Sequence, residues 1–176
     1  MSVAFRAITY VTLFVGFLLV YLPSRFLLWS GIVRPTTMDA PQIAGIIIVS
    51  IGAAIALWCI VAFAWIGKGT PAPFDPPRRL VVRGPYRFVR NPMYIGGALA
   101  LTGAALFYHS LFLLAYGCIF LLAACLFVLF YEEPTLRRTF GPEYEAYCHS
   151  VYRWLPHSVL HLGRLAWIAD RHKHIR

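Results

Sequence analysis

Residues 93–133 read MYIGGALALTGAALFYHSLFLLAYGCIFLLAACLFVLFYEE, and this stretch decides the fold. It contains two apolar runs, 93–108 and 111–131, which are separated only by His109-Ser110. Two residues suffice for a tight turn between helices and for nothing larger. The stretch therefore predicts an antiparallel helical hairpin, in which the start of the first helix and the acidic end of the second, Glu132-Glu133, lie on the same side.

The composition of the chain is typical of a membrane protein. Of its 176 residues, 60% are hydrophobic and only 13% are charged, far from the balance of a soluble domain. A helix needs roughly 20 residues to cross the hydrocarbon layer, with ~17 as the lower limit. Four apolar runs come near this length or exceed it: 4–22, 42–66, 93–108 and 111–131. We therefore expect an all-α integral membrane protein with four transmembrane helices, the first of them retained because no small-x-small cleavage site follows it.

Basic residues indicate how these helices are oriented. The segment 67–92 carries six Lys or Arg residues against one Asp, whereas the turn at 109–110 carries neither Lys nor Arg. Loops rich in Lys and Arg remain on the cytoplasmic side. We therefore expect a multi-pass protein with the N-terminus, the 67–92 loop and the C-terminal tail in the cytoplasm. Membrane topology thus explains the net charge of +9, and nucleic acid is not an expected partner.

Small residues recur at helical spacing on two of the predicted spans. Gly52 and Ala56 lie four positions apart on the second span, and Gly96, Ala100 and Ala104 do so on the third. Such spacing allows two helix backbones to approach closely. Gly and Ala are also common in membrane helices in general, so the pattern leaves both close packing and simple composition open.

The dipeptide Asn91-Pro92 predicts the start of the third span. Asn can accept a hydrogen bond from a free backbone N–H, and Pro has its φ preset for the first helical position. The positive end of this helix would favour an anionic group at the interface. The pair Glu132-Glu133 ends the fourth run, where the helix dipole is unfavourable, and so requires a cation or hydrogen-bond donors nearby. Arg87 and Arg90 are the structural candidates, and a bound ligand is the functional one.

The same residues resemble a family signature. The heptapeptide at 90–96, RNPMYIG, followed by Glu132-Glu133, resembles the RHPxYxG…EE pattern of the isoprenylcysteine carboxyl methyltransferase and phospholipid methyltransferase superfamily. The segments 140–144 and 152–156 are similar to the tail of that family, and the resemblance covers about 68–156. It implies S-adenosylmethionine as the cofactor. Carried over position by position, it implies cofactor contacts of Arg79, Leu80, Val81, Tyr86, Arg90, Asn91, Pro92, Tyr94 and Glu132.

The resemblance also implies a mechanism. Methyl transfer from a sulfonium is an in-line displacement that needs alignment and desolvation more than acid–base help. We expect the cytoplasmic loop and helix ends to hold the cofactor, with Tyr86 and Tyr94 packed on it and Glu132 orienting it. A lipophilic acceptor would enter laterally from the bilayer. Glu132 and Glu133 are the candidate catalytic residues. A phospholipid N-methyltransferase would need a base beside its amine, for which Glu133 is a candidate.

Two positions depart from the family pattern. Asn91 stands where the family usually has His, and an amide cannot carry a proton charge. The prenylcysteine enzymes have an arginine about one turn before the Glu pair to hold the substrate carboxylate, whereas residues 128–131 here read VLFY. This difference weakens the case for carboxyl methylation of a prenylated cysteine.

We expect three regions along the chain. Residues 1–66 form the first two membrane helices, 67–156 the methyltransferase core, and 157–176 a basic interfacial tail. Within the core, Pro142 predicts the start of an amphipathic helix that serves either as a lid over the cofactor or as a surface anchor. The cysteines show no CxxC spacing, and we interpret the closely spaced pairs His157/His161 and His172/His174 as headgroup-facing residues rather than metal ligands.

Three functions remain open from the sequence. The first is an isoprenylcysteine carboxyl methyltransferase-like enzyme that acts on a lipophilic acceptor at the cytoplasmic face. The second is a phospholipid N-methyltransferase. The third, of another class, is a non-enzymatic membrane scaffold or transport subunit, in which the basic loop serves only as a topology determinant and a contact for anionic lipids.

Overall fold

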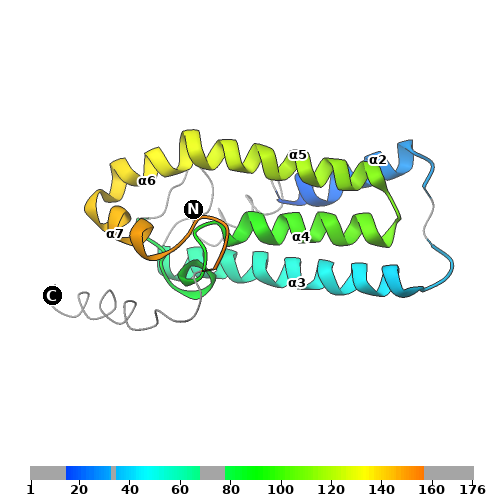
Figure 1. The fold of residues 1–176 in the computed structure, drawn as a ribbon, viewed down its shortest axis with the longest axis horizontal. Helices are drawn as coiled ribbons and strands as arrows, with labels where there is room; N and C mark the ends of the chain where they lie inside the picture. Colours follow the sequence, from blue (N-terminus) through cyan, green and yellow to red (C-terminus); the bar gives the residue numbers. More distant parts are fainter. Residues whose placement is uncertain (1–14, 33–34, 68–77, 157–176) are drawn as a thin grey trace.

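A bundle of parallel and antiparallel helices dominates the computed structural model, which describes residues 15–32, 35–67 and 78–156 (Figure 1). Three long helices lie side by side: α3 (Ala40–Ala62), α4 (Pro92–Phe107) and α5 (Leu111–Phe127). The described residues contain no β-strand, so the prediction of an all-α fold is confirmed for them. The predicted tail at 157–176, residues 68–77 of the loop before α4 and the first part of the first apolar run lie outside the described residues.

Two helices in the described part of the chain are long and apolar enough to cross a membrane. They are Ala40–Gly67, with 28 residues, and Leu111–Phe140, with 30. Phe17–Trp29 and Pro92–Phe107 are apolar but shorter. Side chains on the outer faces of the long helices, such as Ile47, Trp65 and Phe130, are exposed, as lipid-facing residues would be.

Glycines hold α3 and α4 together. A Cβ atom placed on Gly52 would lie 2.5 Å from the carbonyl oxygen of Gly96, and one on Gly45 would lie 2.6 Å from the carbonyl oxygen of Gly103. The predicted close approach is therefore confirmed for Gly52 and Gly96. The contact continues through Gly103 rather than Ala104. A helix has 3.6 residues per turn, so a step of four residues from Gly96 to Ala100 and then one of three to Gly103 stays on the same face.

The predicted hairpin between α4 and α5 is confirmed. Its turn places His109 at a φ of +48°, and the buried side chain of Ser110 accepts a hydrogen bond from the backbone N–H of Leu113 at 3.3 Å. At the same end of the bundle, Nε2 of Gln42 lies 2.7 Å from Nε2 of His109. This contact joins the start of α3 to the turn.

The helix of the first apolar run is longer than predicted. The run was expected to end at Leu22, but the helix continues through Pro23 as α2 (Leu22–Trp29). A π-helical turn, η2 (Phe17–Tyr21), precedes the proline. Proline lacks an N–H and crowds the preceding turn, so a widened turn before it lets the helix continue.

A second widened turn has the same effect on α5. The sequence predicted that this helix ends at the acidic pair, and that prediction is wrong. The helix continues through the π-helical turn η5 (Val128–Glu132) into α6 (Glu133–Phe140). Pro134 follows this turn, and the Thr135 hydroxyl donates to the Tyr131 carbonyl at 2.7 Å. The acidic pair therefore lies inside a continuous helix and not at a negative dipole end.

The short helix α7 (Pro142–Ser150) begins at Pro142, as predicted, after a corner at Gly141 with a φ of +51°. It folds back beside the loop that contains the 3-10 turn η4 (Gly84–Arg87) (Figure 1). Its apolar side faces the protein, because Tyr144, Tyr147 and Val151 are buried against Leu80 and Val82.

Candidate functional site

The start of α4 and the junction of α5 with α6 meet at one end of the bundle (Figure 1). The hydroxyl of Tyr94, in the first turn of α4, donates to Oε2 of Glu132 at 3.0 Å. The predicted convergence of the helix start and the acidic pair is thus present in the structure. It joins two residues that were expected to contact a cofactor.

The π-helical turn η5 determines where Glu132 points. The buried face of α5 runs through Leu113, Gly117, Ala124 and Val128. If α5 continued as a regular α-helix, with about 100° between successive residues, the side chain of Tyr131 would lie nearer to the middle of this buried face than the side chain of Glu132. Because a π turn contains more residues per turn, it brings Glu132 toward the buried face and leaves Tyr131 45% exposed. The widened turn therefore directs a carboxylate into the bundle.

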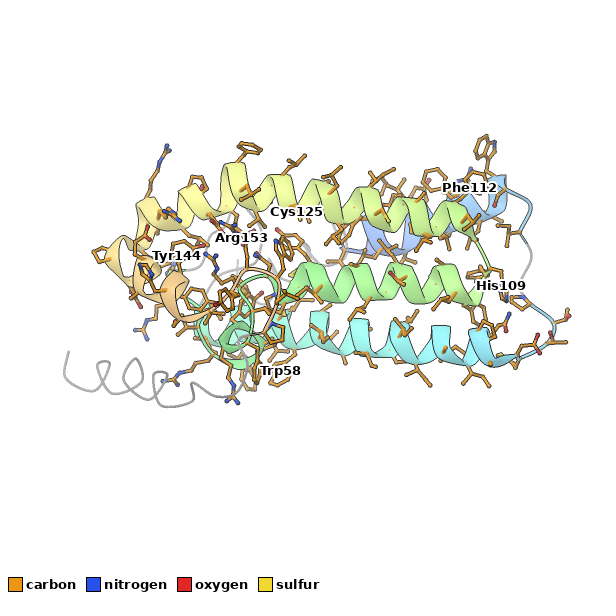
Figure 2. The ribbon with its side chains drawn as sticks, viewed as in Figure 1. Trp58, His109, Phe112, Cys125, Tyr144 and Arg153 are labelled. Carbon is orange, nitrogen blue, oxygen red and sulfur yellow. The ribbon has the colours of Figure 1, made fainter. Side chains whose placement is uncertain are left out.

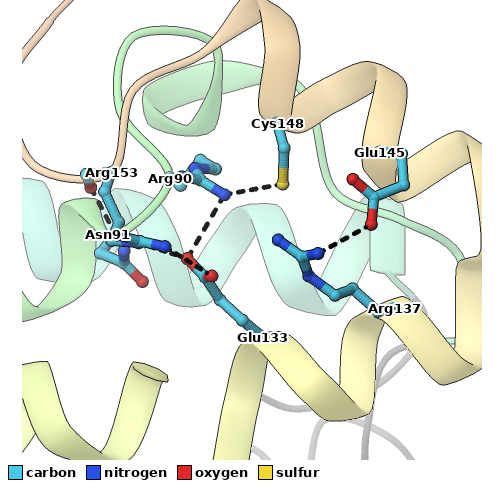
Figure 3. Close-up of polar contacts among 7 residues, drawn as sticks. All are labelled: Arg90, Asn91, Glu133, Arg137, Glu145, Cys148 and Arg153. Carbon is cyan, nitrogen blue, oxygen red and sulfur yellow. Dashed lines mark hydrogen bonds and ion pairs between the residues drawn. The ribbon is translucent and has the colours of Figure 1, made fainter. Parts of the chain in front are cut away.

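Glu133 is held by two arginines (Figure 3). Arg153 makes a bidentate contact, with Nε 2.6 Å from Oε1 and Nη2 2.9 Å from Oε2. Nη1 of Arg90 lies 3.3 Å from Oε1. The hydrogen bonds to Glu133 raise the pKa of Arg153 further above its usual value. Glu133 itself is only 5% exposed, so these ion pairs account for its burial.

The residues just before α4 pair with the segment after α7. The backbone N–H of Arg90 donates to the Tyr152 carbonyl at 2.9 Å, and Nδ2 of Asn91 donates to the Arg153 carbonyl at 3.2 Å. Asn91 precedes α4 as predicted, but its side chain makes no capping hydrogen bond, because its amide is turned toward Arg153. Arg90 also donates from Nη1 to the sulfur of Cys148 at 2.7 Å.

Tyr86 lies in the core between α3 and the loop. Its ring packs edge-on against Phe63, with ring centroids 5.3 Å apart, and beside Cys59. Its carbonyl accepts a hydrogen bond from the hydroxyl of Tyr147 at 2.6 Å. Burial raises the pKa of Tyr86 and of Tyr147 well above the usual range. The structure therefore uses the ring of Tyr86, an expected cofactor contact, in packing.

The other expected cofactor contacts have distinct environments. Arg79 is exposed, Leu80 packs against the tyrosines of α7, and Val81 is buried beside Cys59 and Tyr86. Pro92 is buried at the first position of α4. Leu80 and Val82 thus pack toward α7 and Val81 packs toward α3, which fixes the loop between the two helices.

A small apolar cavity adjoins Tyr94. It has a volume of about 40 Å³ and lies between the first helix, α3, α4 and α5. It is lined by Val15, Leu18, Leu19, Ala56, Met93, Tyr94, Gly97 and Phe120. Tyr94 therefore forms part of an apolar wall while its hydroxyl contacts a carboxylate.

The sequence did not single out Arg153 as a site residue. We expected Arg87 and Arg90 to compensate the acidic pair, and Arg90 does so, but the guanidinium of Arg87 lies over the ring of Phe88, 4.5 Å from its centroid. The available signal for Arg153 was its place in the tail segment 152–156, which resembles the family tail.

Comparison with known proteins gives one match. The model of the family described as phospholipid methyltransferase matches residues 40–143, which is more than half of the chain. No curated protein and no solved structure matches. The matched range includes α3, α4, α5, α6 and the loop before α4, and therefore both Tyr94 and Glu132.

Proposed function

Because the chain belongs to the phospholipid methyltransferase family, we propose that it is a membrane enzyme that transfers a methyl group from S-adenosylmethionine to a lipophilic acceptor. The observation that carries this proposal is the hydrogen bond between Tyr94 and Glu132 beside an apolar cavity. A polar cofactor and an apolar acceptor must meet in this reaction. The Glu132 carboxylate and the Tyr94 hydroxyl offer polar contacts to the cofactor, and the apolar cavity beside them offers a surface to the acceptor.

We propose that four helices cross the membrane, with both termini in the cytoplasm. The arginines at 78, 79, 83, 87 and 90 all belong to the loop before α4, whereas the turn between α4 and α5 carries none. This asymmetry supports a cytoplasmic loop. S-adenosylmethionine is a cytosolic metabolite, so the proposed site opens toward its supply.

We propose different roles for the two glutamates. Glu132 orients the cofactor, with Tyr94 holding its carboxylate in place and packing on the ligand. Glu133 is bound by two guanidinium groups, which favours its ionised form and makes it a poor general base, so we propose that it anchors the chain after α7. Arg79, Leu80, Val81, Tyr86, Arg90, Asn91 and Pro92 would shape the rest of the cofactor site.

In the proposed reaction the cofactor supplies an activated methyl group on a positively charged sulfur. The protein has to align the acceptor with the methyl–sulfur bond and exclude water, because the positive charge of the sulfur is dispersed in the transition state. The apolar residues Met93, Gly97 and Phe120 beside Tyr94 support exclusion of water. The acceptor atom would form a bond to the methyl carbon as the methyl–sulfur bond breaks, which releases S-adenosylhomocysteine, and a methylated amine would then lose a proton to solvent.

Two acceptor classes remain. The family description supports a phospholipid amine, and the earlier resemblance supports a prenylated cysteine carboxylate. Residues 128–131 provide no cation for a substrate carboxylate, since Val128 is buried and Leu129, Phe130 and Tyr131 are exposed apolar or aromatic side chains. This favours the amine. Membership of a methyltransferase family supports an enzyme over a non-enzymatic scaffold.

Calorimetry of S-adenosylmethionine binding to the detergent-purified chain tests the proposal. We expect binding by the natural sequence, loss with Glu132→Ala, and no change with Glu145→Ala, a matched control at an exposed ion pair with Arg137. Absence of binding to the natural sequence would contradict the proposal. Radiolabelled methyl transfer to an aminophospholipid or to a prenylated cysteine then identifies the acceptor class.

A further inference from the structure

Arg153 contacts two different helices. Its side chain binds both carboxylate oxygens of Glu133, the first residue of α6, at 2.6 and 2.9 Å. Its main-chain carbonyl accepts a hydrogen bond from the side chain of Asn91, the residue before α4, at 3.2 Å. The hydrogen bond from the Arg90 N–H to the Tyr152 carbonyl, at 2.9 Å, supports the same connection. One residue therefore links the start of α4 to the start of α6.

These two helix starts carry the pair proposed to hold the cofactor. Tyr94 lies three residues after Asn91, and Glu132 lies one residue before Glu133. Glu132 belongs to the π-helical turn η5, which brings its side chain to Tyr94, and Glu133 follows it directly at the start of α6. A bidentate guanidinium–carboxylate contact fixes orientation as well as distance.

We propose that Arg153 is a positioning residue for methyl transfer, which sets the register between Tyr94 and Glu132 by binding Glu133 and Asn91 together. The proposal rests on the proposed function of Tyr94 and Glu132 as a cofactor-binding pair. The side chain of Arg153 is 37% exposed and binds Glu133, the neighbour of Glu132, while its carbonyl binds Asn91, so its effect on the pair would pass through α4 and α6.

A double-mutant cycle on S-adenosylmethionine affinity tests this role. We expect Arg153→Gln to weaken binding about tenfold or more, because small misplacements of binding groups are costly. In a Glu132→Gln background the same substitution should have little further effect. Arg153→Lys keeps the charge without the planar fork and should recover only part of the affinity. Arg137→Gln removes an arginine of α6 from an exposed ion pair with Glu145 and should leave affinity unchanged.

A merely structural role gives a different result. It would reduce affinity by the same factor in both backgrounds, and that outcome would overturn the proposal. Unchanged affinity in a folded Arg153→Gln protein would overturn it as well.

A second measurement does not depend on the cofactor. Cysteines introduced as Tyr94→Cys and Glu132→Cys can be joined by a short bis-methanethiosulfonate linker and the linked peptides quantified by mass spectrometry. Arg153→Gln should lower the yield of this link severalfold, whereas Arg137→Gln should not. Equal yields would refute the positioning role even if S-adenosylmethionine binds. Absence of cofactor binding together with a reduced yield would instead contradict the proposed function and leave the positioning role supported.

Discussion

Gln42 and His109 lie in contact across the end of the bundle opposite Arg153, with Nε2 of Gln42 2.7 Å from Nε2 of His109 (Figure 2). The other side-chain atom of Gln42, Oε1, accepts a hydrogen bond from the Asp39 backbone N–H at 3.1 Å. The amide nitrogen therefore faces the histidine as a donor, and Nε2 of His109 must accept. We predict the tautomer of His109 that carries its proton on Nδ1 and accepts at Nε2. Nitrogen NMR shifts of the labelled ring report the tautomer, and a proton on Nε2 would contradict the assignment.

The glycine contacts between α3 and α4 predict which small substitutions separate these helices. Gly103→Ala should lower the free energy of unfolding by about 1 to 3 kcal/mol, because its Cβ would lie 2.6 Å from the Gly45 carbonyl oxygen. Gly117→Ala, on α5, is the matched control, since its Cβ would lie 3.4 Å from the Leu101 Cβ. Unfolding in mixed detergent micelles measures both. Equal stability of the two variants would argue against close α3–α4 packing.

The two adjacent glutamates should respond differently to the same substitution. Glu133→Gln leaves Arg153 and Arg90 without their shared carboxylate and should cost about 2 to 3 kcal/mol of unfolding free energy, less than for a fully buried ion pair because Arg153 is 37% exposed. Glu132→Gln keeps an oxygen that can accept from Tyr94 and should change stability little. Thermal unfolding with and without S-adenosylmethionine separates the effects, and a greater loss of stability with Glu132→Gln would contradict this division.

The buried tyrosines predict a loss of stability in alkali. Burial raises the pKa of Tyr147, so the folded protein retains a proton that the unfolded chain releases near pH ~10. The stabilising contribution is therefore complete below that pH and is lost as the pH rises toward the higher folded value. Tyr147→Phe should unfold with a shallower alkaline dependence than the natural sequence. An unchanged alkaline dependence in Tyr147→Phe would contradict this origin.

The hairpin, the start of α4 and the all-α fold followed from local sequence. A two-residue gap at His109-Ser110 and the dipeptide Asn91-Pro92 each have few structural solutions. The π-helical turns were not predicted, because a proline in an apolar run indicates an end or a kink, and hydrophobicity alone does not reveal that the preceding turn can widen. For the same reason the acidic pair was placed at a helix end.

The candidate site was predicted in part. The spacing of the hairpin brought Tyr94 and Glu132 together, since both arms begin from one turn and return to one level. Arg153 was missed because its contact with Glu133 spans 20 residues and a change of chain direction at Gly141, which no helical period encodes. The side-chain direction of Asn91 was missed because its partner, the Arg153 carbonyl, lies 62 residues away.

The brevity of α4 has a consequence for the surrounding lipid. Its 16 residues extend for about 24 Å, while the hydrocarbon layer of a typical bilayer is ~30 Å thick. If α4 spans the membrane as proposed, the bilayer must be thinner around it, or the polar end of the helix must lie below the usual headgroup level. Either arrangement brings lipid headgroups closer to Tyr94. The turnover rate in reconstituted vesicles should then depend on acyl-chain length. It should be higher in lipids with short chains, because a thin bilayer needs less deformation around α4 than a thick one.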